Sequence, residues 1–246
     1  MAIAIVTGGS FQYRGSGVGA GRELMTPGSL LLGNPGQFFE CGHEHAQGDR
    51  CLAFRYAPQY FAAVVDDAVR GRRERFGSLR LPPVRELSAI VARACAAMRT
   101  SAPRAAIAWA ELGVRLAVQA MRADSGREVS QSPVSPASLA RVTRVIRFIE
   151  QHATETLTLA GLAKEARLSP FHFLRTFEDL TGTTPHQYVK RLRLRRAALR
   201  LLADQAKILD IALDTGFGDV SNFDRAFRTE FGVNPRTYRI RHGKCP

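Results

Sequence analysis

The chain has 246 residues, 45% of them hydrophobic, and is therefore long enough to bury one large core or two modest ones. Its 35 basic residues outnumber 22 acidic residues, and the net charge of +13 indicates a polyanionic partner. No apolar run reaches the ~18 residues of a membrane span. The first residues lack the basic region of a secretory signal, and four cysteines are too few for a disulfide scaffold. These features predict a cytoplasmic protein with no membrane partner.

Residues 1–56 are predicted to form short antiparallel strands. Their apolar and alternating runs are separated by Gly, Pro and Asn, which is typical of strands joined by turns. From Pro58 the apolar residues recur with a helical period, so helices are expected within 58–122. The first region is thus a small β-unit followed by helices, whose apolar faces pack either within the chain or against a second copy.

The stretch "CGHEHAQGDRC" combines two cysteines with two histidines. If residues 37–45 form a strand, alternate side chains share one face, and a hairpin turn at 47–49 brings the second cysteine back beside it. That face would offer the thiolates and imidazoles that zinc, or another divalent metal, prefers. The candidate metal ligands are Cys41, His43, His45 and Cys51. Their spacing matches no common zinc module, so a polar barrel lining with no cofactor is the alternative.

Residues 123–137, "ADSGREVSQSPVSPA", replace apolar periodicity with Ser, Pro and Gly and are interpreted as an interdomain linker. The charge is denser after this segment than before it. Residues 138–246 hold 19 basic and 11 acidic side chains, whereas residues 1–137 hold 16 and 11. The segment after the linker is therefore the better candidate for binding a polyanion.

The region after the linker is predicted to be helical and contains the same pattern twice. The stretch that begins at Leu159 aligns with the one that begins at Ile208, and two phenylalanines, a glycine, a proline and a tyrosine recur in register. Each copy has the pattern of a short helix, a tight turn and a longer helix. This is the helix-turn-helix pattern, whose second helix enters the DNA major groove. The motifs are expected at about 159–181 and 208–231; the alternative is two hairpins that only fill a bundle.

Three features favour DNA reading over the bundle. Phenylalanines four residues apart give each second helix one buried face, while arginine, asparagine and serine stand on the other faces. A predicted helix from Thr184 to about Ala203 joins the copies, and its length of roughly 30 Å is close to the ~34 Å between successive major-groove openings. This helix carries a basic run that is interpreted as DNA-binding: Lys190, Arg191, Arg193, Arg195, Arg196 and Arg200.

The second copy carries three linked motifs: "A-x-x-x-G-F" before its turn, "F-x-R-x-F" in its second helix and "G-x-x-P-x-x-Y-R" after it. With these motifs, residues 138–242 closely resemble the AraC/XylS family of transcriptional regulators. The resemblance implies a seven-helix DNA-binding domain with two helix-turn-helix units. It also implies a protein that activates or represses transcription and is not an enzyme.

The resemblance, carried over by position, implies which side chains the reading helices present to DNA. Those of the first helix are Ser169, Pro170, Phe171, Leu174 and Arg175. Those of the second are Val220, Ser221, Asn222, Asp224 and Arg225, and Arg228 stands beside them on an exposed face. Leu174 replaces a residue that is often polar in the family, so its expected contact is a thymine methyl group. Asp224 is expected to accept a hydrogen bond from a cytosine amino group.

The stretch "PGSLLLGNPGQFFECGHEH" is similar to the cupin-type sensor part of such regulators, although Phe38 and Phe39 replace the usual metal-binding histidine. The β-region is short for a complete barrel, which leaves a reduced barrel or a natural frame that starts before Met1. The expected fold is α+β: a small β-rich, cupin-like N-terminal unit with helices at 1–122, then an all-α DNA-binding domain with two helix-turn-helix motifs at 138–242.

The main hypothesis is a sequence-specific DNA-binding transcriptional regulator whose first region senses a signal or dimerises. The expected partners are double-stranded DNA, a small-molecule effector, a second copy of the chain and, for an activator, RNA polymerase. Two alternatives use the cysteines. One is a metal-responsive regulator, and the other is a DNA alkylation-repair protein of the Ada type with Cys41 or Cys51 as methyl acceptor, although such modules use four cysteines.

Overall fold

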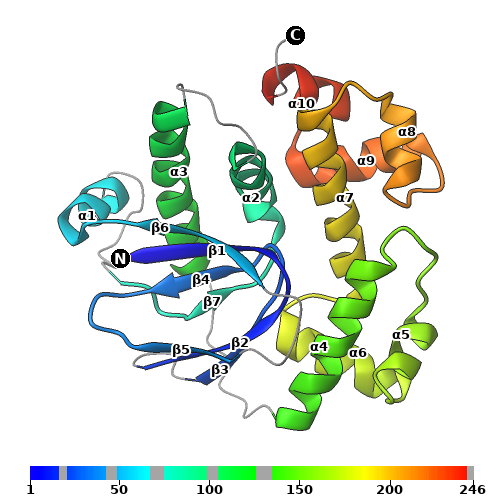
Figure 1. Cartoon of the computed structure of the whole chain (residues 1–246), viewed down its shortest axis with the longest axis horizontal. Helices are drawn as coiled ribbons and strands as arrows, with labels where there is room; N and C mark the ends of the chain where they lie inside the picture. Colours follow the sequence, from blue (N-terminus) through cyan, green and yellow to red (C-terminus); the bar gives the residue numbers. More distant parts are fainter. Residues whose placement is uncertain (17–20, 43–48, 67–74, 99–104, 126–134, 243–246) are drawn as a thin grey trace.

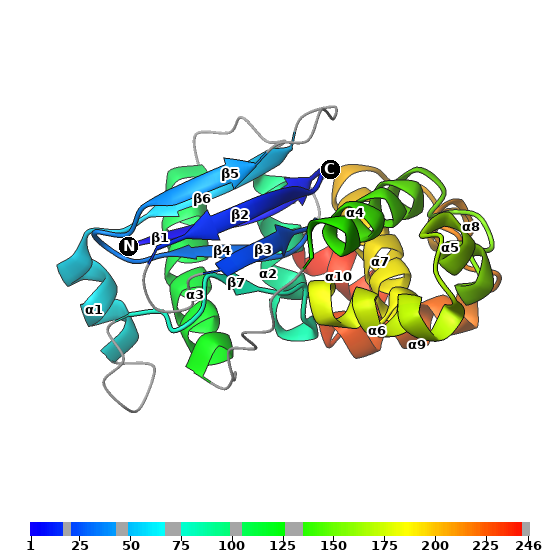
Figure 2. The same cartoon turned by 90° about the horizontal axis from the view of Figure 1, so that it is seen from below.

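The computed structural model describes residues 1–16, 21–42, 49–66, 75–98, 105–125 and 135–242. An N-terminal unit of two small sheets and helices lies beside a C-terminal group of helices (Figure 1). Figure 2 shows the C-terminal helices gathered at one end of the stacked sheets. The fold is mixed α+β, as the sequence predicts. No helix in the described ranges is long and apolar enough to cross a membrane.

The described strands form two antiparallel sheets. The four-stranded sheet has the order β6-β1-β4-β7, and the three-stranded sheet has the order β3-β2-β5. The strands are β1 (Ala2–Gly8), β2 (Phe11–Gly15), β3 (Gly21–Met25), β4 (Leu30–Gly33), β5 (Phe39–Gly42), β6 (Arg50–Arg55) and β7 (Arg80–Leu81). The antiparallel strands predicted within residues 1–56 are therefore confirmed, and β3 is an additional strand that the apolar pattern did not reveal.

The helices predicted within residues 58–122 are present, and strand β7 is an addition to them that the sequence did not indicate. Its two residues pair with Leu30 and Leu31 of β4 and complete one edge of the four-stranded sheet. Arg80 and Leu81 are both buried there. A strand of two residues has no alternation to detect, so its partner in space, and not its own sequence, defines it.

The N-terminal helices cover one face of the four-stranded sheet. They are α1 (Pro58–Asp66), α2 (Arg85–Ala97) and α3 (Ala105–Ser125). Ile3 and Ile5 of β1 are 0% exposed and pack with Leu116 of α3, while Val6 faces the other way and packs with Tyr13 of the three-stranded sheet. The apolar faces of these helices are therefore buried within the chain.

The segment interpreted as a linker, 123–137, is helical at both ends, because α3 runs to Ser125 and α4 starts at Pro136. Asp124 is buried and accepts hydrogen bonds from the backbone nitrogens of Gly77 at 2.6 Å and Ser78 at 3.1 Å. A polar residue at this point is thus part of the packed structure, which its residue type alone does not indicate. Residues 126–134 lie outside the described part of the chain.

The C-terminal region consists of helices throughout its described length, as predicted. The helices are α4 (Pro136–Gln151), α5 (Leu159–Glu165), α6 (Pro170–Thr181), α7 (Pro185–Ala203), α8 (Ile208–Asp214), α9 (Val220–Phe231) and α10 (Pro235–His242). They form two separate buried clusters. Tyr188 and Leu192 place the first half of α7 in the cluster of α4–α6, whereas Leu194 and Leu201 place its second half in the cluster of α8–α10.

Candidate nucleic-acid interface

The first reading helix, α6, begins at a tight turn that the sequence specifies locally. Arg167 has a left-handed backbone with φ of 56°, which reverses the chain after α5. The Ser169 hydroxyl then accepts a hydrogen bond from the backbone nitrogen of His172 at 3.4 Å, and Pro170 occupies the first turn. Turn and cap together orient the N-terminal end of α6.

The second reading helix, α9, begins in the same way with different residues. Gly216 has φ of 93°, and a Cβ atom there would lie 2.9 Å from the Cα atom of Thr154. Only glycine fits both the backbone conformation and this close approach. The Asp219 carboxylate caps α9 and accepts a hydrogen bond from the backbone nitrogen of Asn222 at 2.6 Å.

The buried faces of the two reading helices are equivalent. Each contains two phenylalanines that are 0% exposed and whose ring centroids lie 5.5 Å apart: Phe173 with Phe177, and Phe223 with Phe227. The second ring of each pair lies against a tyrosine, Tyr188 or Tyr238, at 5.7 Å and 5.3 Å. The sequence repeat is therefore also a repeat of packing.

The outer faces carry the residues that the sequence analysis assigned to DNA. The exposed ones are Ser169, Pro170, Phe171, Arg175, Val220, Ser221, Asn222, Arg225 and Arg228, and the half-buried ones are Leu174 and Asp224. The structure adds His172, which is exposed in the first turn of α6 with its Nδ1 3.2 Å from the Ser169 hydroxyl. Its place three residues after the cap was the signal that sequence reasoning missed.

Both reading helices point in the same general direction. The C-terminal end of each rests on the N-terminal unit, through Arg80 against the Thr181 carbonyl and Ser88 against the Glu230 carboxylate. Their N-terminal ends therefore point away from that unit. Figure 1 agrees, because α5 and α8, which lead into those ends, lie on the side remote from the sheets. The N-terminal unit leaves the outer faces of α6 and α9 uncovered.

The basic run of α7 serves the fold, and its interpretation as a DNA-binding surface is wrong for most of its members. Arg193 donates to the carbonyls of Ala153 at 2.6 Å and Gly216 at 2.8 Å, and Arg196 donates to the Glu150 carbonyl at 2.5 Å. Arg191 pairs with Glu230 at 3.4 Å, and Arg200 pairs with Asp214 at 2.6 Å. Burial lowers the pKa of Arg195. These guanidinium groups satisfy internal carbonyls and carboxylates, which sequence periodicity cannot anticipate.

The predicted Cys/His hairpin is a further correction. Strand β5 pairs with β2 and places Cys41 opposite Tyr13, whereas β6 pairs with β1 and places Cys51 opposite Val6. The two strands belong to different sheets, so they do not form one hairpin face. The histidines and the expected turn lie outside the described residues. Among the residues described, no group of three or more His, Cys, Asp or Glu side chains could hold a metal ion.

The thiols are poorly suited to accept a methyl group. Burial and the neighbouring Asp49 raise the pKa of Cys41. Burial, Asp49 and the Cys41 thiol together raise the pKa of Cys51 to about 11. A thiol with a raised pKa is protonated at neutral pH, and the thiolate is the nucleophilic form. The chemistry of these two side chains thus counts against the repair alternative, and the metal site stays a prediction from the sequence.

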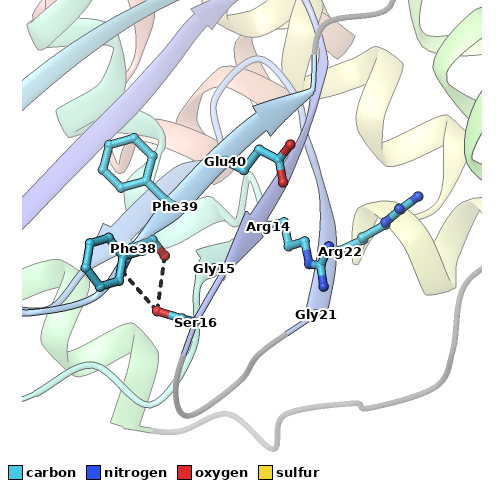
Figure 3. A pocket seen from close by; sticks show the side chains of 8 residues that line it. All are labelled: Arg14, Gly15, Ser16, Gly21, Arg22, Phe38, Phe39 and Glu40. Carbon is cyan, nitrogen blue, oxygen red and sulfur yellow. Dashed lines mark hydrogen bonds between the residues drawn. The ribbon is translucent and has the colours of Figure 1, made fainter.

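An open concavity of about 760 Å³ lies at the end of the three-stranded sheet (Figure 3). Arg14 stands opposite Arg22 on one side and opposite Glu40 on the other. Phe38 and Phe39 are 82% and 65% exposed, and both line the concavity. The Ser16 hydroxyl donates to the Phe38 carbonyl at 3.3 Å and accepts from the Phe38 nitrogen at 3.0 Å. These bonds connect the two segments that line the concavity at this point.

Comparison with known proteins places the similarity in the C-terminal helices. Residues 162–241 match a family described as a helix-turn-helix domain. The regulatory protein SoxS of Salmonella typhimurium is 33% identical over 100 residues, which cover 41% of this chain and 94% of SoxS. The transcriptional activator RhaS of Escherichia coli O139:H28 is 33% identical over 102 residues. That match covers 42% of this chain but only 37% of RhaS.

The chain is also similar in sequence to a domain of known structure. The DNA-binding domain of AdpA, in complex with a target DNA, is 27% identical, with 41% of this chain and 91% of that chain covered and a TM-score of 0.40.

Two helix-turn-helix units joined by one long helix define a DNA-binding regulator of transcription. The match to nearly the whole length of SoxS makes the family explicit. The chain belongs to the AraC/XylS family of transcriptional regulators.

Proposed function

We propose that the protein regulates transcription by inserting the N-terminal halves of α6 and α9 into consecutive major grooves of one operator. The observation that carries this proposal is the pair of equivalent exposed faces, both directed away from the N-terminal unit, at opposite halves of α7. Helix α7 has 19 residues and is therefore roughly 28 Å long. This length suits two readers on one side of DNA, whose groove openings are about 34 Å apart.

The exposed side chains of the two reading helices suit different bases. Arg175 and Arg225 occupy equivalent positions of the repeat and suit bidentate contacts to guanine, while Asn222 suits adenine. The first helix adds the apolar Phe171 and Leu174, which suit thymine methyl groups. We therefore expect different base sequences at the two half-sites.

Paired arginine variants test this assignment. On an operator selected from a random DNA library, Arg225→Ala should cost about 1–3 kcal/mol and relax base preference in one half-site only. Arg175→Ala should do the same in the other half-site. Arg236→Ala is the matched control, because Arg236 is exposed on α10 outside both reading faces. Loss of preference in the same half-site for both variants would contradict two separate readers.

We also propose that the concavity of the three-stranded sheet takes a small effector with an anionic group and an aromatic ring. The proposal is supported by Arg14 and Arg22, which are exposed side by side, and by the exposed rings of Phe38 and Phe39. Calorimetric titration with phenylacetate, and with neutral 2-phenylethanol as control, tests it. Binding of the anion that Arg22→Gln abolishes is expected, and equal binding of both compounds would contradict it.

The remaining expectations stay proposals from the sequence. They are a cytoplasmic location, a homodimer, RNA polymerase as the partner of an activator, and the lack of enzymatic activity. Crosslinking of the DNA-bound full-length chain would test the homodimer directly.

A further inference from the structure

One short segment of the N-terminal unit contacts the C-terminal ends of both reading helices. This segment runs from Arg80 on β7 to Ser88 on α2. We propose that it acts as a strut that sets the distance between the two reading helices, so that the chain prefers half-sites at one spacing. This inference rests on the proposed function, in which both helices read DNA together. Arg80 and Ser88 are positioning residues and do not touch DNA themselves.

The contact to the first reading helix is a buried arginine. Arg80 donates through Nε to the Glu23 carboxylate at 2.8 Å and through Nη1 to the Thr181 carbonyl at 3.2 Å. Its side chain is only 7% exposed. Thr181 is the last residue of α6, so the guanidinium group lies at the negative end of the helix dipole and satisfies a terminal carbonyl. Glu23 holds the same guanidinium group from β3, and this fixes its direction.

The contact to the second reading helix is a buried carboxylate. Glu230, in the last turn of α9, accepts a hydrogen bond from the Ser88 hydroxyl and lies 3.4 Å from Arg191 of α7. Its side chain is 8% exposed. One helical turn after Ser88 on α2, Ala92 is buried in the same cluster as Phe223 and Phe227. Helix α2 is therefore packed against α9 as well as hydrogen-bonded to it.

The segment between these two contacts is stiff. Leu81, Pro82 and Pro83 are all buried, and each proline ring fixes its own φ angle.

The two helix-turn-helix units have separate buried clusters. Apart from this segment they are joined by α7, by the Arg193 hydrogen bonds to the Ala153 and Gly216 carbonyls, and by the close approach of Gly216 to Thr154. None of these contacts involves the C-terminal end of α6 or α9, so a connection across those ends adds resistance to bending of α7.

The strut is also close to the proposed effector site. Arg22 lines the concavity, and Glu23, which holds Arg80, is the next residue on β3. A displacement of β3 would move Glu23 and, through Arg80, the C-terminal end of α6.

The experiment measures how strongly the affinity for DNA depends on the spacing between the two half-sites. Full-length protein is titrated against the selected operator and against versions with one base pair added or removed between the half-sites. Wild type should prefer the selected spacing, and Arg80→Gln and Ser88→Ala should each reduce that preference about fivefold or more. Affinity for DNA that carries one half-site should stay within about twofold of wild type, since the reading faces are intact.

Matched variants separate positioning from folding. Arg85→Gln changes an exposed arginine of the same segment and should keep the wild-type spacing preference. Arg80→Lys retains a cation near the Thr181 carbonyl and should restore part of it. Unchanged spacing preference in both Arg80→Gln and Ser88→Ala, with circular dichroism that shows folded protein, would overturn the strut. Protection of only one half-site by wild type would instead overturn the proposed function.

Discussion

The two helix-turn-helix units have the same skeleton but expose different chemistry. Phe173 and Phe177 have their counterparts in Phe223 and Phe227, with the same exposure and the same ring separation. Their outer faces differ: the first helix presents the apolar side chains of Pro170, Phe171 and Leu174, and the second presents the polar side chains of Ser221, Asn222 and Arg225. The buried positions that recur between the units build the fold, and the exposed positions that differ are where the proposed base contacts would differ between the two half-sites.

The largest effect is expected from the shared skeleton. Phe177→Ala and Phe227→Ala should each destabilise the protein by about 3–5 kcal/mol, because each removes a completely buried ring. Phe171→Ala is the control, since a ring that is 70% exposed should cost less than about 0.5 kcal/mol. Urea unfolding monitored by circular dichroism measures all three. A cost below about 1 kcal/mol for either buried ring would break the equivalence of the two units.

The two turns should respond in opposite directions. Gly216→Ala should destabilise the second unit by about 1–3 kcal/mol, because φ of 93° and the approach of Thr154 leave no room for a Cβ atom. Arg167→Gly should instead stabilise the first unit by up to about 1 kcal/mol, since it relieves a left-handed arginine. Thermal unfolding measures both changes. A stabilising Gly216→Ala would contradict the turn geometry.

Arg228 offers a test of phosphate contact as opposed to base contact. It is exposed beside the reading face of α9, and Arg228→Ala should weaken binding equally to all operator sequences. The slope of log affinity against log salt should become shallower by about 1, which corresponds to one lost phosphate contact. Fluorescence anisotropy between low and physiological salt measures this slope. A change in base preference would instead place Arg228 at a base edge.

The smallest effects are expected in the dependence of stability on pH, and their direction differs between the two units. Burial raises the pKa of Glu150 above its ordinary value of 4.5, although Arg195, Arg196 and Arg147 oppose the rise. The folded state therefore holds this proton more tightly, and the associated stability is lost as pH rises from 4.5 through the raised pKa. Glu150→Gln should remove this pH dependence. If Glu150→Gln keeps the wild-type dependence of stability on pH, Glu150 is not the cause of that dependence.

His242 of α10 should behave in the opposite sense. Burial and the nearby Arg93, Arg241 and Arg115 lower its pKa from 6.5. Its contribution to stability is full above pH 6.5 and is lost as pH falls through the lowered pKa. His242→Gln should therefore flatten the stability curve on the acid side of neutrality, as measured by unfolding at a series of pH values. An unchanged acid limb would show that partial desolvation and the nearby arginines do not lower the pKa of His242.

The repeat made the C-terminal region predictable from sequence. Phenylalanines spaced four apart, a serine and an aspartate at helix starts and glycines at the turns each act on near neighbours, so local patterns are sufficient. The same reasoning failed wherever a residue is defined by a distant partner. Arg193 was interpreted as DNA-binding but satisfies the carbonyls of Ala153 and Gly216, and β7 exists only because β4 lies beside it.

The Cys/His stretch illustrates the same limit. Its period of two correctly indicated strands on both sides, but periodicity does not say which strands pair. The cysteines fell in different sheets because β5 pairs with β2 and β6 pairs with β1. Strand pairing of this kind depends on contacts far apart in sequence, and the alternation of side chains does not record it.

Hydroxyl-radical footprinting of the full-length protein on its selected operator tests most directly whether the two units read DNA together. Two protected half-sites, centred about one helical turn apart on the same face of the duplex, are the predicted result. Arg175→Ala and Arg225→Ala should each weaken protection of a different half-site. One protected half-site in the wild type, or the same half-site affected by both variants, would contradict a protein with two separate DNA readers.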